Sequence, residues 1–139
     1  MERAKDPNKG LLSPAGGKLH TDIAESPFVC AVREANEECG IVSDISDWEM
    51  IGLITERDYP GIGNLMIFMF EYKKRLKELP AHSIEGNFRF VPADEILNSN
   101  IPDTDKLYIW KYVLNKRSSF YSVHIDCTVS PYACTIEQS

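Results

Sequence analysis

The sequence has no long hydrophobic run. Its longest, LMIFMF at residues 65–70, falls far short of the roughly 18 to 20 apolar residues that a membrane-spanning helix needs. The amino-terminal stretch MERAKDPNKG also lacks the apolar segment of a secretory signal. These absences argue against a spanning helix and an exported protein, so we expect a cytoplasmic protein with no membrane partner.

Metal-binding cysteine motifs and an excess of positive charge are absent as well. The four cysteines, Cys30, Cys39, Cys127 and Cys134, form no CxxC pair and have no histidines at zinc-finger spacing. We expect them to be reduced, packed thiols. The formal net charge of −6 opposes nonspecific binding to nucleic acid, which depends on clustered lysine and arginine. A small anionic ligand stays compatible with this charge if a metal ion supplies positive charge locally.

Repeats and low-complexity tracts are missing too. The 139 residues suffice for a single domain over 1–139 with a buried core, and are too few for two. Strand-like patterns occur at four places, residues 48–57, 64–74, 87–91 and 120–129. Because the run 65–70 is apolar at every position, this strand is expected to be covered on both faces. The pattern predicts an α/β fold with a mixed sheet between helical layers.

Helix signals lie between these strand patterns. Ser26 suits the N-cap, Pro27 the first helical position and Gly40 the stop of a helix over 27–39. A short helical turn is predicted near 93–97 and a longer helix at about 104–115. The longer helix has one apolar stripe, formed by Leu107, Trp110 and Leu114.

The helix over 27–39 concentrates acidic side chains on one side. At about 100° per residue, Glu34, Glu37 and Glu38 lie opposite an apolar stripe. Three converging carboxylates cannot all stay ionised without a counter-charge, and divalent cations such as Mg²⁺ prefer oxygen ligands. Arg33 precedes Glu37 by one turn and can pair with it. A solvated acidic face is the alternative for an isolated helix. The stripe itself consists of Phe28, Val32, Ala35 and Cys39.

This helix and its flanks resemble the Nudix box, the signature of hydrolases that cleave nucleoside diphosphates linked to another group. Its second half is nearly complete, since Glu25 is followed after seven residues by Arg33 and Glu34, and then by Glu37, Glu38, Gly40 and Ile41. The preceding SPAGGKL resembles the family's Gly-Gly-Lys turn, and EGNFRFVPADEIL at 85–97 is similar to the segment before its last strand and helix. The resemblance covers most of the chain and implies a Nudix-like α/β/α sandwich.

The sequence departs from the family pattern at three points. Seven residues, not five, separate Gly17 from Glu25, and Ala35 takes a place where a larger aliphatic residue is common. Family members also have one or two strands before the Gly-Gly turn, whereas this chain begins almost at the turn. We therefore expect a sheet without its usual first strand or strands. An unpaired edge attracts another chain, which predicts a homodimer through the N-terminal edge or a natural chain that starts upstream of Met1.

The resemblance also implies a metal site and a set of catalytic residues. Mg²⁺ or Mn²⁺ would be bound by Glu34, Glu37, Glu38 and the carbonyl of Gly16 or Gly17. Glu25 and Arg33 would form an ion pair that holds the loop and the helix in register. Catalysis would involve the three helix carboxylates together with Glu85, and Glu56 is a weaker candidate. The sequence does not indicate which carboxylate accepts the proton of the attacking water.

Several further residues are candidates for binding a substrate. Arg3 and Lys18 can reach phosphates, whereas Lys9 is better explained as a solvated cation. Tyr59 can stack on a nucleobase. Of the other residues weighed, His82 is expected to be polar surface, Phe90 and Trp110 are expected to be core, and Phe88 can stack on a base.

The leading hypothesis is a metal-dependent Nudix hydrolase. It would cleave the pyrophosphate bond of a nucleoside triphosphate, an oxidised nucleotide or another nucleoside diphosphate derivative. One alternative is a catalytically impaired Nudix-fold module that binds a nucleotide or a partner. A further alternative is a structural cation site on an unrelated α/β fold. The retained carboxylates favour the enzyme, since a pure sensor has no need of three.

Overall fold

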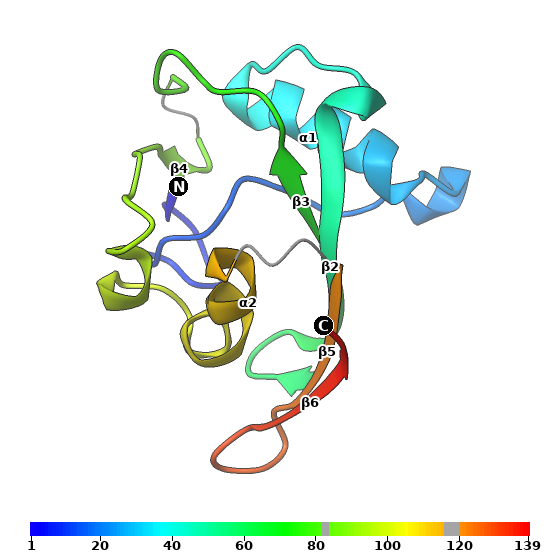
Figure 1. Ribbon diagram of the computed structural model, residues 1–139, viewed down its shortest axis with the longest axis vertical. Coiled ribbons are helices and arrows are strands. Elements are labelled where there is room, and N and C mark those ends of the chain that lie inside the picture. Colours follow the sequence, from blue (N-terminus) through cyan, green and yellow to red (C-terminus); the bar gives the residue numbers. More distant parts are fainter. Residues whose placement is uncertain (82–83, 116–119) are drawn as a thin grey trace. The chain divides into compact units, whose positions relative to one another are not determined.

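The structure is a computed structural model that describes residues 1–81, 84–115 and 120–139 (Figure 1). The chain divides into two compact units. The first contains Met1–Glu49 and Phe70–Pro92, and the second contains Met50–Met69 and Ala93–Ser139. The arrangement as a single domain stays a prediction.

Helix α1 (Pro27–Cys39) belongs to the first unit and has the predicted boundaries. Ser26 Oγ accepts a hydrogen bond from the Val29 amide at 3.3 Å, which caps the helix N-terminus. Gly40 ends the helix at φ 65°, a left-handed conformation that glycine adopts without a Cβ penalty. The helix buries Cys30 and Ala35, and short 3₁₀ turns at Thr21–Ile23 and Ile45–Asp47 lie on either side of it.

A two-stranded antiparallel sheet completes the secondary structure of the first unit. In it β1 (Glu2–Arg3) pairs with β4 (Gly86–Asn87). The other side of β1 is also bonded within the chain, because the Arg3 amide donates to Leu11 O and the Gly10 amide donates to Arg3 O, both at 2.9 Å. The prediction of a strand over 87–91 is wrong beyond Asn87. The strand β4 ends there because its partner β1 has only two residues with which it can pair.

The larger sheet has the strand order β3-β2-β5-β6. It is mixed, as predicted, because β2 pairs parallel to β5 and β5 pairs antiparallel to β6 (Figure 1). Sequence reasoning missed β6 as a strand. The bounds are β2 (Trp48–Tyr59), β3 (Gly63–Tyr72), β5 (Tyr121–Asp126) and β6 (Ala133–Gln138).

Strand β3 differs from expectation. It lies at an edge of the sheet, and its Met66 is 63% exposed. The expectation that the run 65–70 is covered on both faces is therefore wrong. A run of apolar residues tells how hydrophobic a strand is, whereas its position in the sheet depends on long-range pairing.

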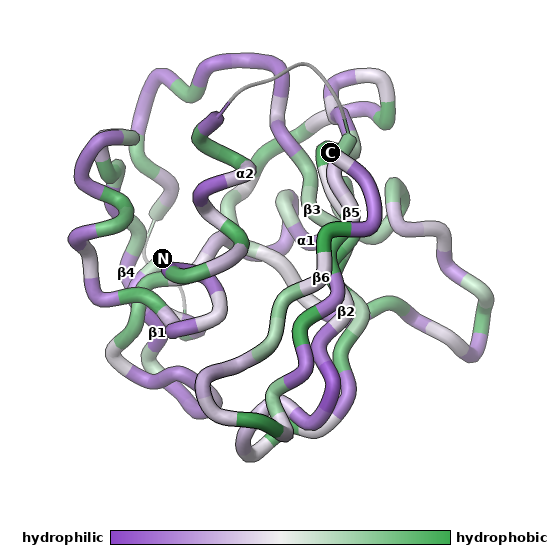
Figure 2. Tube along the Cα trace, turned by 60° about the horizontal axis from the view of Figure 1, so that its bottom comes forward, coloured by the Kyte–Doolittle hydropathy of each residue, from purple (hydrophilic) through white to green (hydrophobic). Residues whose placement is uncertain are grey.

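The second unit has its core between strands and a helical segment. Residues Asp105–Ile109 form a π-helical turn that continues into α2 (Trp110–Leu114), and hydrophobic and hydrophilic residues interleave along α2 (Figure 2). The prediction that Leu107 belongs to a buried apolar stripe is wrong, because this side chain is 52% exposed. Ile109, which was not part of the predicted stripe, is buried instead at 3% exposure. A π turn bonds each residue to the fifth along the chain, so it shifts the face that a 3.6-residue period predicts. The core consists of Ile54, Ile109, Tyr121, Val123 and Ile125.

The remaining helical structure is short. The turn expected near 93–97 is a 3₁₀ turn at Ile96–Asn98. Among the described residues, no helix is long and apolar enough to cross a membrane.

Candidate active site

The Gly-Gly turn is attached to helix α1 in the first unit. The Gly16 amide donates a hydrogen bond to Glu38 Oε2 at 2.9 Å. Gly17 lies so close to the Glu34 carboxylate that a Cβ at this position would overlap it. Two neighbouring glycines thus meet two of the acidic side chains that the sequence places on one side of the helix.

Glu25 and Arg33, the residues expected to pair, are in contact. Arg33 Nε lies 2.8 Å from Glu25 Oε1, and Nη2 lies 2.9 Å from Oε2. The Glu25 side chain is only 3% exposed. Hydrogen bonds from Arg33, and then from the His20 amide, lower the pKa of Glu25 to about 2. Arg33 Nη2 also donates a hydrogen bond to Lys18 O at 3.1 Å. Arg33 therefore holds the lengthened loop before the helix at two points, Glu25 and Lys18.

The same guanidinium contacts two more carboxylates on α1. Arg33 Nη1 lies 2.6 Å from Glu34 Oε1 and 3.2 Å from Glu37 Oε2. These hydrogen bonds with Glu25 and Glu34 raise the pKa of Arg33. Sequence reasoning anticipated the contact with Glu37 and missed the one with Glu34, because adjacent residues do not normally face each other on a helix. Arg33 therefore supplies much of the counter-charge for this acidic side of the helix.

Glu38 occupies a different electrostatic environment. Burial is the main cause that raises its pKa, and the nearby carboxylates of Glu34 and Glu85 act in the same direction. The Gly16 hydrogen bond and the Arg3 guanidinium oppose this rise. Burial and two neighbouring carboxylates thus disfavour the ionised form of Glu38, and a bound cation would favour it.

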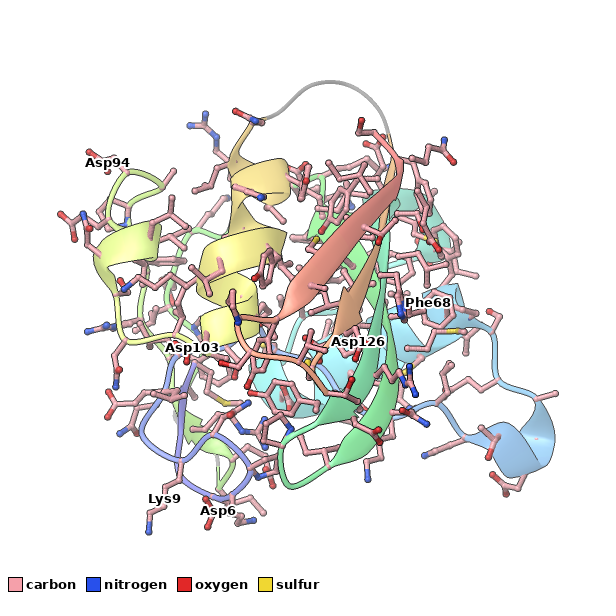
Figure 3. The ribbon with its side chains drawn as sticks, turned by 90° about the horizontal axis from the view of Figure 1, so that it is seen from below. Asp6, Lys9, Phe68, Asp94, Asp103 and Asp126 are labelled. Atoms are coloured by element: carbon pink, nitrogen blue, oxygen red, sulfur yellow. The ribbon has the colours of Figure 1, made fainter. Side chains whose placement is uncertain are left out.

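Glu85 is held beside the N-terminal segment of the first unit. Its carboxylate lies 3.2 Å from Lys5 Nζ, and its carbonyl accepts a hydrogen bond from the Ala4 amide at 2.9 Å. Arg3 directs its Nε to Pro7 O at 2.8 Å. Lys9 is exposed and extends into solvent (Figure 3). Sequence reasoning did not identify Lys5, whose partner lies far away in the chain.

The donor atoms suit a hard divalent cation, although they do not form a complete metal shell. Carboxylate and carbonyl oxygens are the ligands that Mg²⁺ takes. Within residues 1–81, 84–115 and 120–139, no three acidic, histidine or cysteine side chains are grouped closely enough to hold a metal ion. Glu34 and Glu37 are turned to Arg33, and Glu38 is bonded to Gly16. The chemistry of these oxygen atoms fits the expected ion. To bind it, Glu34 and Glu37 would have to leave Arg33, and Glu38 would have to leave the Gly16 amide.

Other predicted residues have different surroundings. Tyr59 ends β2 in the second unit, where Glu56 is 4% exposed. Phe90 is 62% exposed, so its expected place in the core is wrong, whereas Phe88 is buried at 8% exposure. His82 lies outside the described residues.

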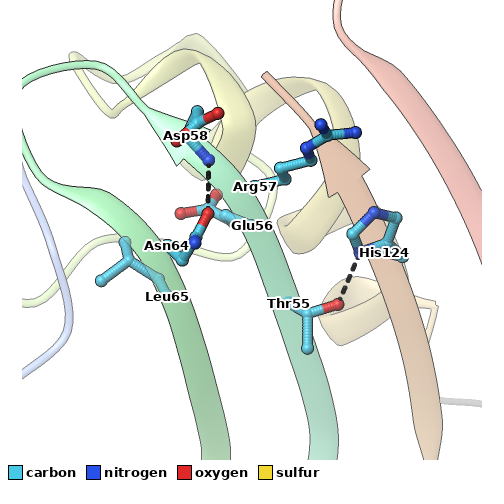
Figure 4. Close-up of a pocket in the computed structure, with 7 residues that line it drawn as sticks. All are labelled: Thr55, Glu56, Arg57, Asp58, Asn64, Leu65 and His124. Atoms are coloured by element: carbon cyan, nitrogen blue, oxygen red, sulfur yellow. Dashed lines mark hydrogen bonds between the residues drawn. The ribbon is translucent and has the colours of Figure 1, made fainter. Parts of the chain in front are cut away.

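The second unit also has an open pocket of about 500 Å³, which sequence reasoning did not identify (Figure 4). Thr55 Oγ1 and His124 Nδ1 are 2.8 Å apart, and the Asp58 amide donates to Asn64 Oδ1 at 3.0 Å. Glu56 also lines the pocket, and its buried Oε1 atom has no hydrogen-bond partner among the described residues. Its lining consists of Thr55, Glu56, Arg57, Asp58, Asn64, Leu65 and His124.

Known proteins resemble this chain in sequence and in fold. Residues 1–111 match the NUDIX domain. The crystal structure of the mutator MutT protein from Bacillus halodurans is similar, with a TM-score of 0.72 and 24% sequence identity. The match covers 92% of this chain and 84% of that one, and at this identity it shows the fold alone. No curated protein matches the sequence closely enough to count as a relative.

Proposed function

Because the chain belongs to the NUDIX domain family, we propose that it is a pyrophosphohydrolase that depends on Mg²⁺ or Mn²⁺. Its proposed substrate is a nucleoside triphosphate, an oxidised nucleotide or another nucleoside diphosphate derivative. The observation that carries this proposal is the environment of Glu38. This carboxylate is bonded to the Gly16 amide at 2.9 Å and feels the negative charges of Glu34 and Glu85.

The proposed metal ligands are oxygen atoms of the first unit. They are the carboxylates of Glu34, Glu37 and Glu38 and the carbonyl of Gly16 or Gly17. When bound, the metal would neutralise phosphate oxygens and lower the pKa of a water molecule. Such charge neutralisation and positioning account for most of the catalysis in phosphoryl chemistry.

The other residues hold and orient these ligands. Arg33 holds the loop through its ion pair with Glu25. It also orients Glu34 and Glu37 through two further ion pairs. Lys5 holds the Glu85 carboxylate, which is a candidate to accept a proton from water. Arg3 and Lys18 are proposed to bind the phosphates of the substrate. Tyr59 belongs to the second unit, and its role as a residue that stacks on a base stays a prediction from the sequence.

The proposal is tested with a panel of nucleotides, by measuring the release of phosphate or pyrophosphate with Mg²⁺ and with EDTA. Glu38→Gln keeps the shape of the side chain and removes its charge. We expect turnover to fall by about a hundredfold or more, because an electrostatic contact of about 3 kcal/mol is lost. The control is Glu49→Gln, a change at an exposed residue of the same unit. Near-normal, Mg²⁺-dependent turnover by folded Glu38→Gln would contradict the assignment.

A nucleotide-binding or regulatory module is the second candidate. The observation in its favour is that Arg33 already neutralises Glu34 and Glu37, so these carboxylates have a partner without a metal. Calorimetric titration with nucleotides that are not hydrolysed distinguishes the two functions. Tight binding without turnover on any member of the panel supports the module, whereas turnover supports the enzyme.

A further inference from the structure

The open pocket of the second unit contains an acid that the proposed reaction does not use. Glu56 is one of the residues that line this pocket of about 500 Å³, and it is only 4% exposed. The Thr104 side chain hydrogen-bonds to its carboxyl group, yet the Oε1 atom is buried without a partner among the described residues. A buried carboxyl oxygen without a donor is costly, so this position favours a ligand that donates a hydrogen bond to it.

A second acid without a partner lines the same pocket. Asp58 lies near the end of β2, two residues beyond Glu56, and its backbone amide donates to Asn64 Oδ1 at 3.0 Å. Its carboxylate makes no hydrogen bond and no ion pair within the part of the chain that the structure describes. The pocket therefore contains two acidic side chains with unused acceptor oxygens.

The positive charge of the pocket is paired with a different acid. Arg57 is the only lysine or arginine among the lining residues. Its Nη1 lies 3.5 Å from Asp126 Oδ2, and its side chain extends toward β5 (Figure 4). His124 Nδ1 lies 2.8 Å from Thr55 Oγ1, so this ring nitrogen also has a partner. The lining thus leaves its two unpaired acids open to a cation from outside the chain.

The chemistry of these two acids favours an organic cation over a metal ion. Among the described residues, no three acidic, histidine or cysteine side chains are grouped closely enough to hold a metal. An amidinium or guanidinium group presents several N–H donors in one plane, and it is more weakly hydrated than an ammonium group. Such a group therefore loses less hydration when it meets a buried carboxyl group such as that of Glu56.

The dimensions of the pocket fit this class of ligand. Small-molecule pockets have volumes of roughly 300–1,000 Å³, a range that includes this one. Leu65 supplies an apolar side chain beside the polar lining (Figure 4). We propose that the pocket of the second unit binds a small organic cation, whose amidine or guanidine group donates hydrogen bonds to Glu56 and Asp58. All lining residues belong to this unit, so the proposal does not depend on the metal site of the first unit.

Benzamidine is a suitable probe, because benzamide has nearly the same shape and carries no charge. Titration of the protein with each compound, without metal or nucleotide, is followed by proton–nitrogen NMR. Benzamidine is expected to shift the amide signals of Asn64 and His124 and to saturate them, with a dissociation constant of about 1 mM or lower. Benzamide should bind about tenfold more weakly or less, because it cannot make a hydrogen bond from a charged donor.

Two variants test which acids hold the probe. Glu56→Gln keeps the shape of the side chain and should weaken benzamidine binding about tenfold or more, and Asp58→Asn, at an exposed position, should weaken it as well. The matched control is Asp103→Asn, an exposed acid of the same unit outside the pocket lining, which should bind as the wild type does (Figure 3). Absence of saturable shifts, equal affinity for benzamide, or unchanged affinity of folded Glu56→Gln would each overturn the proposal. If Glu56→Gln does not fold, unchanged affinity of Asp58→Asn would overturn it.

Discussion

Arg33 and Glu25 are joined by two parallel hydrogen bonds, from Nε to Oε1 at 2.8 Å and from Nη2 to Oε2 at 2.9 Å. Only arginine presents this planar pair of donors to a carboxylate. The contact joins helix α1 to the loop before it. It also aims the remaining guanidinium nitrogen at Glu34 and Glu37.

The Arg33–Glu25 pair predicts a loss of stability in acid. The pKa of Glu25 falls from 4.5 to about 2 in the folded chain, so its contribution to stability is present above pH 4.5 and is lost as the pH falls toward 2. We expect Glu25→Gln to lower the urea midpoint at pH 7 and to approach the wild type near pH 2. Urea unfolding in the absence of metal measures this. Glu49→Gln should instead keep the wild-type dependence, and a constant gap between Glu25→Gln and wild type would refute the prediction.

Gly17→Ala is expected to separate folding from activity. The added Cβ would overlap the carboxylate of Glu34, which is the flexible end of a side chain and can move aside. Gly17 has no positive φ, so alanine causes no backbone strain there. We expect a change in stability of less than about 1 kcal/mol, and a fall in hydrolysis of about tenfold or more, because Glu34 is displaced. Thermal melting and nucleotide hydrolysis measure the two effects.

The control for this change is Ala15→Ser, at an exposed position of the same turn. It should alter neither property. Full activity of Gly17→Ala would show that the close approach of Gly17 to Glu34 has no role in the reaction.

Gly52→Ala is expected to destabilise the second unit. Gly52 is opposite Tyr121 in the pairing of β2 with β5, and a Cβ at Gly52 would overlap the buried ring of Tyr121. Overpacking of this kind costs about 1–3 kcal/mol, which corresponds to a melting temperature lower by roughly 4 °C per kcal/mol. Differential scanning calorimetry measures the shift. In a Tyr121→Leu background the same change should cost less, and equal costs in both backgrounds would exclude the clash as the cause.

The formation of a homodimer through the N-terminal edge stays a prediction, which a measurement of the molecular mass in solution can test. Both sides of β1 are hydrogen-bonded within the chain, so pairing of two chains at this edge would have to replace contacts such as Arg3 to Leu11. Light scattering across micromolar concentrations measures the mass. A dimer is the expected result, and if it forms through β1, Glu2→Pro should dissociate it, because proline removes the backbone donor. An active monomer at all concentrations would show the prediction to be wrong.

The sequence by itself determined the local features of this protein. The capping residues Ser26 and Gly40 set the limits of α1, and the spacing of Glu25, Arg33, Glu34, Glu37 and Glu38 identified the family. Caps, turns and periodic patterns act between residues that are close in sequence, so they can be read directly from it. The mixed character of the sheet also followed from the pattern of strands and helices.

Only the tertiary structure decided which distant residues meet. It placed β3 at an edge, added β6, and put Lys5 beside Glu85. It also buried the Glu56 side chain and formed a π turn at Asp105–Ile109 that no 3.6-residue period predicts. Such contacts depend on strand pairing, burial and loss of hydration across the chain, and their energies are set by the neighbours that the fold brings together.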